Sequence, residues 1–428
     1  MVKFKRAALQ RFVNLREKSA PPVFVGRNSL VKEILTVART TGEERVGIPG
    51  NTMVVQGAPG AGKSSLLSYL TLQNTKDNAP KTLHISSIEL EEQLSDVLLA
   101  IAALGRTPKS KLKHLALKTA KSVGSLAILD SIGLADITAV NVTALFRSHE
   151  IETIGSLHKA FPVDQWDAPV IVAVDEAQNL PRGRESRQAR FLRSLHEAVT
   201  KLPLSLVLAG LGDTQSRLRA MGLTQGVQAC ALGCFTADET QILMRRWCAY
   251  FGIEVGSQQN QIDVLIAPTD GWPRHVHWAQ QALAETLLEL DVDGRLDQID
   301  DWTRIYDRSN RLRYAYYDTQ FSEEMTASCK LVGRVMLAVD KANSDGAGKT
   351  FGEIKDLVTM YQGHQPGSEW MMPGGYDENL FVTHLIHCGV LQRRSMNPDD
   401  HVMTCPIPSF QSYIIKRGGF DVPRDFAS

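Results

Sequence analysis

The sequence predicts an α/β protein in which a parallel sheet is followed by a helical lid domain and a C-terminal winged-helix domain. Three observations support this prediction. Short, continuously apolar runs alternate with helical stretches between residues 52 and about 215, a glycine-rich loop follows the first run, and the strand pattern fades beyond residue 230. Continuous apolar strands separated by helices are typical of a parallel sheet covered on both faces.

The overall composition limits the partners of the chain. The 428 residues are enough for two or three domains, and 47 basic side chains balance 47 acidic ones. A neutral chain has no global attraction to nucleic acid or to an anionic membrane, so such a contact must come from a local patch. The six cysteines include no CxxC pair, which is typical of a reducing, cytoplasmic setting. The least polar long window carries Asp130 and Asp136, so we expect no membrane-spanning helix.

Shifts in composition and in periodicity divide the chain into five parts. We expect a basic N-terminal arm, a sheet domain with a helical insert at about 91–165, a helical lid, a polar, arginine-rich connector and a winged-helix domain. These parts cover residues 1–20, 21–230, 231–300, 301–322 and 323–428.

The N-terminal arm combines positive charge with a helical pattern of apolar residues. The apolar residues at helical spacing are Phe4, Ala8, Phe12 and Leu15. This spacing favours a helix that docks by its apolar side and exposes a basic face. The alternative is an arm that contacts nucleic acid or an acidic protein partner. The basic residues are Lys3, Lys5, Arg6, Arg11, Arg16 and Lys18.

Apolar runs predict the strands of the sheet domain, and capping and periodicity predict the helices beyond it. The strands are expected near 52–56, 81–90, 169–178 and 204–211. Thr236 and Glu239 form a capping-box pattern that opens an amphipathic helix ending at Gly252. Three helices and a hairpin then outline a winged helix-turn-helix. The further helices are expected near 257–267, 272–290, 323–341, 350–361 and 376–388, and the hairpin strands at 389–395 and 401–407.

The glycine-rich loop is the most specific signal in the sequence. Residues 57–64, GAPGAGKS, fit the pattern GxxxxGK(S/T) at every fixed position, directly after an apolar strand. The backbone N–H groups of such a loop wrap a phosphate chain, and side chains would block that approach. Lys63 is expected to add positive charge at the outer phosphates, and Ser64 to offer a hydroxyl ligand to magnesium. The residues expected to contact the nucleotide here are Gly57, Ala58, Pro59, Gly60, Ala61, Gly62, Lys63, Ser64 and Ser65.

A pair of carboxylates follows the third apolar run. The stretch VIVAVDEAQ places Asp175 and Glu176 at the end of a buried strand, about 110 residues after the loop. After a phosphate-binding loop, this pattern predicts one carboxylate that faces magnesium, Asp175, and one that orients the attacking water, Glu176.

Together these residues resemble those of the AAA+ ATPases. More narrowly, the chain is similar to the clade that contains the origin-recognition ATPases, the transposition ATPases and the STAND-type signalling NTPases. The stretch PPVFVGRNSLVKEIL resembles the box that opens those modules, which implies that Gly26 and Arg27 lie near the adenine. The stretch TDGWPRHVHWA resembles the sensor 2 motif, which implies that Arg274 reaches the γ-phosphate from the lid. The resemblance covers about residues 21–290.

The sequence departs from the family pattern at two positions. A polar sensor 1 residue is usual at the tip of the strand after the acidic pair, but here Gly210, Leu211 and Gly212 come first. We therefore take Thr214 as the sensor 1 candidate. The arginine that would reach a neighbouring subunit also has several candidates. They are Arg217, Arg219, Arg190 and Arg193.

The resemblance implies an ATPase that requires magnesium and is slow as a monomer, because part of its site comes from a neighbouring copy. It would act as a nucleotide-dependent homo-oligomer on double-stranded DNA. The alternative is a STAND-like signalling or scaffold ATPase whose winged helix or basic arm binds a protein partner. Residues 330–420 hold nine basic and nine acidic side chains, whereas a duplex-binding domain is normally basic. The catalytic residues that the resemblance implies are Lys63, Asp175, Glu176 and Arg274.

Overall fold

The computed structural model describes most of the chain outside the predicted insert. The described residues are 3–14, 21–39, 52–75, 79–87, 97, 101, 104, 168–181, 183, 186–198, 203–290, 292–320, 323–364, 371–395 and 400–418. The chain forms two compact units. We call them the sheet unit (27–56 and 63–230) and the helical unit (1–26, 57–62 and 231–428), and we describe each by itself. The insert at about 91–165 lies almost wholly outside the described residues.

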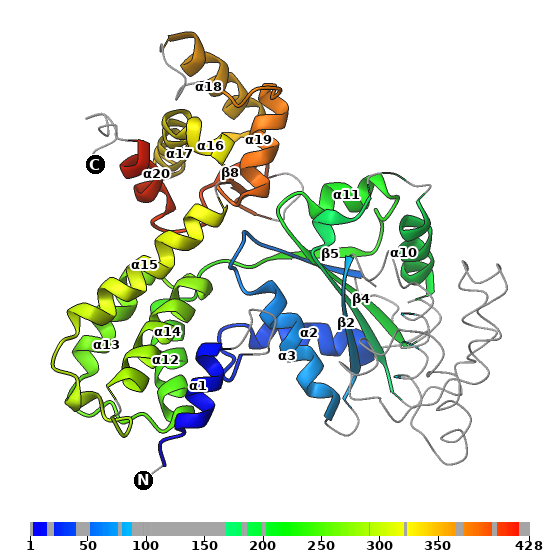
Figure 1. The fold of residues 1–428 in the computed structure, drawn as a ribbon. Helices are drawn as coiled ribbons and strands as arrows, with labels where there is room; N and C mark the ends of the chain where they lie inside the picture. Colours follow the sequence, from blue (N-terminus) through cyan, green and yellow to red (C-terminus); the bar gives the residue numbers. More distant parts are fainter. Residues whose placement is uncertain are drawn as a thin grey trace, which may run out of the picture. The chain divides into compact units, whose positions relative to one another are not determined.

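The sheet unit is built on a five-stranded sheet with the strand order β2-β3-β4-β1-β5 (Figure 1). The pairs β2–β3, β3–β4 and β4–β1 are parallel, with Val54 opposite Leu208 and Val172 opposite Leu206. This confirms the predicted parallel sheet and its four predicted strands. The fifth strand was not predicted, because only one of its residues is strongly apolar. The strands are β1 (Thr52–Gln56), β2 (Lys81–Ser86), β3 (Val170–Asp175), β4 (Leu204–Gly210) and β5 (Val227–Ala231).

Helices cover both faces of this sheet, which explains why the central strands are apolar throughout. All residues of β1 and β4 are buried. The connections β1–α3–β2 and β3–α10–β4 run in opposite directions along the sheet, so right-handed crossovers place their helices on opposite faces. Figure 1 shows α2 and α3 on one side and α10 and α11 on the other. The helices are α2 (Asn28–Arg39), α3 (Lys63–Leu72), α10 (Arg187–Ala198) and α11 (Thr214–Ala220).

The helical unit begins with the lid, a cluster of helices around its own apolar core. Helix α12 opens with the predicted capping box. Glu239 N–H donates to the Thr236 hydroxyl, and Thr236 N–H donates to the Glu239 carboxylate. The helix stops at Gly252, which takes the left-handed conformation (φ 70°). The lid helices are α12 (Ala237–Phe251), α13 (Gln259–Ile266), α14 (Pro273–Glu289) and α15 (Thr303–Gln320).

The N-terminal arm forms α1 (Arg6–Asn14), which packs on the lid. Leu9 and Phe12 are buried, and the Phe12 ring lies 5.5 Å from Trp247 and 5.6 Å from Phe251. Arg6 donates a hydrogen bond to the carbonyl of Leu288. Of the two interpretations of the arm, the structure therefore agrees with the docking helix.

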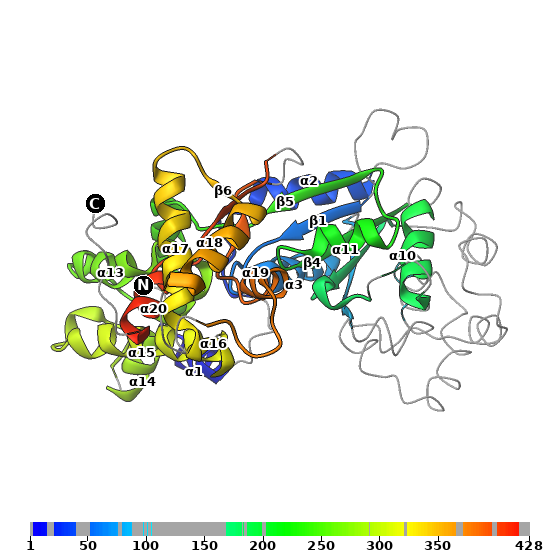
Figure 2. The same cartoon turned by 90° about the horizontal axis from the view of Figure 1, so that it is seen from above.

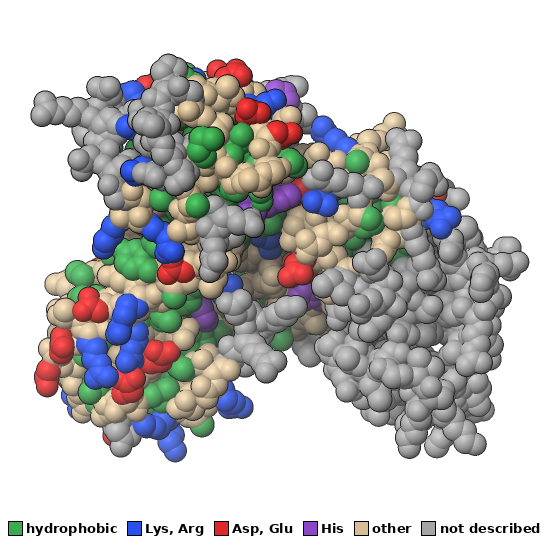
Figure 3. Space-filling view, turned by 45° about the horizontal axis from the view of Figure 1, so that its top comes forward, with side chains coloured by type: hydrophobic (Ala, Val, Ile, Leu, Met, Phe, Trp, Pro, Cys, Tyr) green, Lys and Arg blue, Asp and Glu red, His purple; other side chains and the backbone are tan. Residues whose placement is uncertain are grey.

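Most of the predicted connector at 301–322 is helix α15, which the sequence analysis did not predict. Ile305, Tyr316 and Tyr317 are buried along one side of this helix. The arginines of this segment made it resemble a polar linker. Two of them, Arg304 and Arg308, pair with acidic residues of α14, and Arg308 lies 2.8 Å from Glu289. Basic and acidic side chains accordingly alternate over the surface of the lid (Figure 3).

The C-terminal domain contains the predicted three helices and hairpin. Its small sheet is antiparallel with the order β6-β8-β7. Figure 2 shows α18 beside both α17 and α19. The helix expected over 323–341 is interrupted at Ser328, whose hydroxyl donates to the carbonyl of Met371 (2.6 Å). The elements are α16 (Glu323–Ala327), α17 (Cys329–Ser344), β6 (Lys349–Thr350), α18 (Phe351–His364), α19 (Glu378–His387), β7 (Gln392–Arg393), β8 (Val402–Thr404) and α20 (Phe410–Gly418).

Within the helical unit, the Tyr317 hydroxyl joins the buried His275 of the lid to the C-terminal domain. His275 Nε2 lies 2.9 Å from the Tyr317 hydroxyl, which also lies 3.0 Å from the Ser409 hydroxyl. The other ring nitrogen lies 3.3 Å from the carbonyl of Thr269. Burial, together with the nearby charge of Arg313, lowers the pKa of His275 to about 3. The ring is therefore neutral in the folded protein at physiological pH.

No helix among the described residues could cross a membrane.

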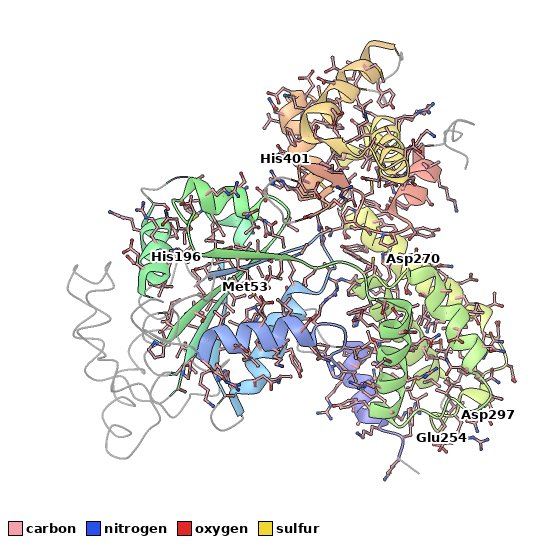
Figure 4. All side chains as sticks on the ribbon, turned by 180° about the vertical axis from the view of Figure 1, so that it is seen from behind. Met53, His196, Glu254, Asp270, Asp297 and His401 are labelled. Carbon is pink, nitrogen blue, oxygen red and sulfur yellow. The ribbon has the colours of Figure 1, made fainter. Side chains whose placement is uncertain are left out.

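We expect the stability of the protein to fall as the pH drops from about 6.5, because the unfolded chain then protonates His275 and the folded one does not. Each pH unit in this window should lower the free energy of unfolding by about 1.4 kcal/mol. Urea denaturation at about pH 5 and about pH 7.5 measures the slope. His275→Gln should flatten it, whereas the exposed His401 (Figure 4) provides the control His401→Gln. An unchanged slope in the His275 variant would contradict the assignment.

Candidate functional site

The predicted phosphate-binding loop lies in the helical unit as residues 57–62. Gly60 (φ 83°) and Gly62 (φ 92°) have backbone conformations that only glycine adopts without strain. Ala61 N–H donates to the carbonyl of Ala58 at 3.1 Å, which closes a tight turn. A Cβ atom on Gly60 would lie only 2.8 Å from the Cβ of Arg274. The loop therefore has no room for a side chain at Gly60, a position that the sequence pattern itself leaves variable.

The start of α14 faces this loop. Asp270 (φ 46°; Figure 4) and Gly271 (φ 69°) turn the chain sharply into Trp272. Arg274 N–H then donates to the carbonyl of Gly60 at 3.2 Å. The indole N–H of Trp272 is buried, has no acceptor among the described residues, and lies 2.9 Å from the point that a Gly60 Cβ would occupy. A buried N–H without an acceptor costs about 1–3 kcal/mol, and a phosphate oxygen at the loop would supply one. Because Trp272 is fully buried, a phosphate oxygen could accept this N–H only if the groups around the indole moved aside.

Arg274 is held between two aromatic rings. Its guanidinium carbon lies 5.7 Å from the ring centre of Trp278 and 5.7 Å from that of Tyr316. Tyr316 comes from α15, the helix that the sequence did not predict. Cation–π contacts of this kind hold a guanidinium in a fixed place without neutralising its charge. The two rings thus hold the guanidinium of Arg274, whose Cβ lies against the loop residue Gly60.

The acidic pair lies at the end of β3 in the sheet unit. Glu176 follows the strand in the left-handed conformation (φ 55°), and its N–H donates to Asp175 Oδ1 at 2.9 Å. Burial would raise the pKa of Asp175, but the neighbouring side chains of His84 and Ser64 and the N–H of Glu176 bring it below its ordinary value. Asp175 is therefore an ionised carboxylate. The structure brings together Ser64 and Asp175, the two residues predicted to bind magnesium.

His84 is part of this cluster and was not found by sequence reasoning. Its Nε2 lies 3.6 Å from Asp175 Oδ2. In the register of the sheet His84 is opposite Ala173, two residues before Asp175, so both side chains lie on the same face. The stretch KTLHIS predicted only a strand, because a single histidine carries no signal of its strand partner.

The model of the family described as novel STAND NTPase 1 matches residues 8–302, which is more than half of the chain. The chain belongs to this family. The match confirms the recognition of a P-loop NTPase of STAND-like type. No curated protein matches the sequence.

Solved structures resemble this STAND NTPase only distantly. A RuvB point mutant from Thermotoga maritima is 14% identical, with 96% of this chain and 100% of that chain covered and a TM-score of 0.42. The Aeropyrum pernix ORC1 protein in complex with DNA is 13% identical, with 95% and 96% covered and a TM-score of 0.41. Domain III of the Thermotoga maritima replication initiation protein DnaA is 13% identical, with 69% and 97% covered and a TM-score of 0.40.

The C-terminal domain of this STAND NTPase contacts the phosphate-binding loop within the helical unit. Ala58 N–H donates to the side-chain carbonyl oxygen of Gln392, in β7, at 2.9 Å. Gly389 packs so closely on Pro59 that a Cβ atom there would clash with the proline ring. The contact joins residues that are 334 positions apart, and no pattern in the sequence indicates it.

The predicted sensor 1 residue, Thr214, is buried at the start of α11. Its hydroxyl has no hydrogen-bond partner in the described part of the chain and is packed against Gly210. A different polar side chain reaches the tip of β4. The Gln178 side-chain oxygen accepts a hydrogen bond from Leu211 N–H at 3.2 Å. Gln178 lies two residues after Glu176, so the sequence places it near the site but does not indicate this bond.

The arginine candidates differ in their surroundings. Arg217 lies 2.8 Å from Asp213 and donates to the carbonyl of Leu180 at 3.1 Å, so it is engaged within its own subunit. Arg219 and Arg190 are exposed, and Arg193 is half-buried. These surroundings leave Arg217, Arg219, Arg190 and Arg193 as candidates, with Arg219 and Arg190 the most accessible to solvent.

The two residues of the predicted opening box belong to different units. Gly26 (φ 77°) lies in the helical unit, where a Cβ atom would come within 2.6 Å of the Phe235 ring. Arg27 lies in the sheet unit, and its carbonyl accepts the N–H of Val31 in the first turn of α2. Gly26 is therefore required for close packing in the helical unit, whatever it does toward a ligand.

Proposed function

We propose that this STAND NTPase binds ATP with magnesium, hydrolyses it, and acts as a nucleotide-dependent oligomeric switch. The observation that carries the proposal is that Ser64 lies close enough to the ionised Asp175 to lower the pKa of its carboxyl. In P-loop NTPases the hydroxyl after the loop lysine and the carboxylate at a strand end hold magnesium together. Oxygen donors of this kind suit magnesium, so the residues fit the ion.

Each of the proposed residues has a role that follows from its chemistry. The N–H groups of the loop, Gly57 to Gly62, hold the phosphates, with Lys63 and Ser65 at the start of α3. Lys63 and Arg274 offset negative charge on the outer phosphate, and Glu176 orients the attacking water. Ser64 and Asp175 would hold magnesium, which would supply positive charge against the outer phosphates.

Three further roles complete the proposed nucleotide site. Gly26 and Arg27 would lie near the adenine, and Thr214 would sense the outer phosphate. A neighbouring copy of the chain would supply an arginine, with Arg217, Arg219, Arg190 and Arg193 as candidates. Because such an arginine is worth about 10³-fold or more in rate, a monomer should hydrolyse ATP slowly.

For the target of the switch, we propose double-stranded DNA bound by the C-terminal domain as a winged helix. The order helix–strand–helix–helix–strand–strand supports this proposal. Arg393 in β7 is the basic residue of the hairpin best placed for a phosphate, because Arg394 pairs with Asp400 at 3.2 Å. Asp377 caps α19 by accepting the N–H of Leu380 at 2.7 Å, which places negative charge at the start of that helix.

A second function, a signalling switch that acts on a protein partner, is favoured by the bond between Gln392 and Ala58. The Ala58 N–H belongs to the loop that would hold phosphate, so a side chain bonded there competes with a ligand. If the Gln392 side chain can bind or release this N–H, the position of the C-terminal domain would depend on whether nucleotide is bound to the loop. The basic arm is a weaker candidate for the partner surface, because its apolar side packs on the lid.

Lys63→Ala should abolish ATP binding, because the outer phosphates lose their main cation, whereas Glu176→Gln should bind ATP and stall its turnover. Isothermal titration calorimetry and phosphate release measure the two effects. Lys32→Ala, an exposed lysine of α2, is the control.

Specific ATPase activity should also rise with protein concentration, because a neighbouring copy would supply the arginine. Tight ATP binding by the Lys63 variant, or flat activity over a wide dilution range, would reject the corresponding part of the proposal.

If DNA is the target, duplex binding should require ATP and fall steeply with salt. Arg393→Ala should reduce the slope of log affinity against log salt by about one, since one phosphate contact is lost. Fluorescence anisotropy of a labelled duplex checks both effects, with exposed Arg311→Ala of the lid as the control. An absence of duplex binding at low salt would rule out this target and leave the protein-partner function.

If Gln392 competes for the loop, Gln392→Ala should speed the association of a fluorescent ATP analogue several-fold, because the Ala58 N–H is released. Stopped-flow fluorescence gives the rate. The matched control is Gln411→Ala, which removes a glutamine of the same domain that bonds to Asp340. Equal rates for Gln392→Ala and the wild type would count against the competition.

A further inference from the structure

The two carboxylate oxygens of Asp175 have different neighbours, one next in the chain and one on the adjacent strand β2. Its Oδ1 accepts the N–H of the next residue, Glu176, at 2.9 Å. Its Oδ2 faces His84 Nε2 on β2, at 3.6 Å. The His84 side chain is 24% exposed and that of Asp175 13%, so little water is available to replace either contact.

One contact alone would leave the carboxylate loosely oriented. The terminal torsion of an aspartate has a broad preference, so a bond to one oxygen fixes that atom but allows the other to swing. Glu176 N–H is also a neighbour in the chain and moves with Asp175. A donor on another strand removes this freedom, because the ladder between β2 and β3 fixes its distance.

The sheet register makes room for the imidazole. The residue opposite His84 is Ala173, which is fully buried and has the smallest side chain of any chiral residue. The imidazole can therefore extend over Ala173 toward Asp175, two residues further along the same face. A larger residue at 173 would push the ring away from the carboxylate.

We propose that His84 is a positioning residue that fixes the plane of the Asp175 carboxylate, and thereby sets the strength with which magnesium supports nucleotide binding. This rests on the proposed function, since it assumes that Asp175 is a magnesium ligand. His84 touches neither nucleotide nor metal in this proposal; it acts through the carboxylate. Residues that orient metal ligands in this way typically change metal affinity by 10- to 100-fold.

The test measures binding of a fluorescent ATP analogue with magnesium and with EDTA, independently of turnover. His84→Ala should weaken binding in magnesium by about tenfold or more and leave binding in EDTA unchanged. His84→Gln should restore most of the loss, because its amide N–H reaches to about the position of Nε2. The matched control is His196→Ala, a half-buried histidine of α10 bonded to Thr52 at 2.7 Å.

A double-mutant cycle separates positioning from general destabilisation. In an Asp175→Ala background, His84→Ala should cause no further loss of magnesium-supported binding. Two results would overturn the proposal while the proposed ATPase stands. One is that His84→Ala weakens magnesium-supported binding in the Asp175→Ala protein as much as it does in the wild type. The other is that His84→Ala and the wild type bind equally. A wild-type chain that binds no nucleotide in magnesium or EDTA would instead reject the proposed function itself.

Discussion

An aspartate that is largely buried and yet ionised is the constraint on which the sheet unit depends. Burial favours the protonated acid, so Asp175 stays charged only because donors surround it. Those donors come from three places: the first turn of α3, the neighbouring strand β2, and the left-handed turn at Glu176. The parallel order of the sheet brings these places to one edge. A change in the register between β2 and β3 would remove His84 from the group and expose the charge to an apolar interior.

The helical unit has a corresponding constraint around the loop. Gly60 lies against Arg274, Trp272 and Tyr316, which come from two lid helices and the turn before them. The same lid is tied to the C-terminal domain by His275, Tyr317 and Ser409. Loop, lid and C-terminal domain are thus connected by short polar contacts in an otherwise apolar core. Such contacts are directional, and they hold each element to one arrangement more strictly than apolar packing does.

The local parts of the fold and of the site could be predicted from the sequence, and the parts that depend on distant residues could not. The glycine loop, the acidic pair at Asp175 and the cap at Thr236 are short patterns whose neighbours lie within a few positions. His84 and Gln392 have partners 91 and 334 positions away, and neither lies in a recognisable pattern. Helix α15 was missed for a different reason: arginines such as Arg308, which pair with α14, hide its apolar side.

The buried indole N–H of Trp272, which has no acceptor among the described residues, affects the affinity of the loop for an anion. A dry donor without an acceptor raises the free energy of the ligand-free protein, and it does so before any ligand arrives. A ligand oxygen at that point would relieve about 1–3 kcal/mol, which corresponds to roughly 5- to 150-fold in a dissociation constant. Because the Trp272 side chain is fully buried, a ligand oxygen could reach its N–H only after the surrounding groups moved, and the cost of that movement would reduce the gain. The affinity of the loop for an anion is thus linked to how easily the packing around one indole can open.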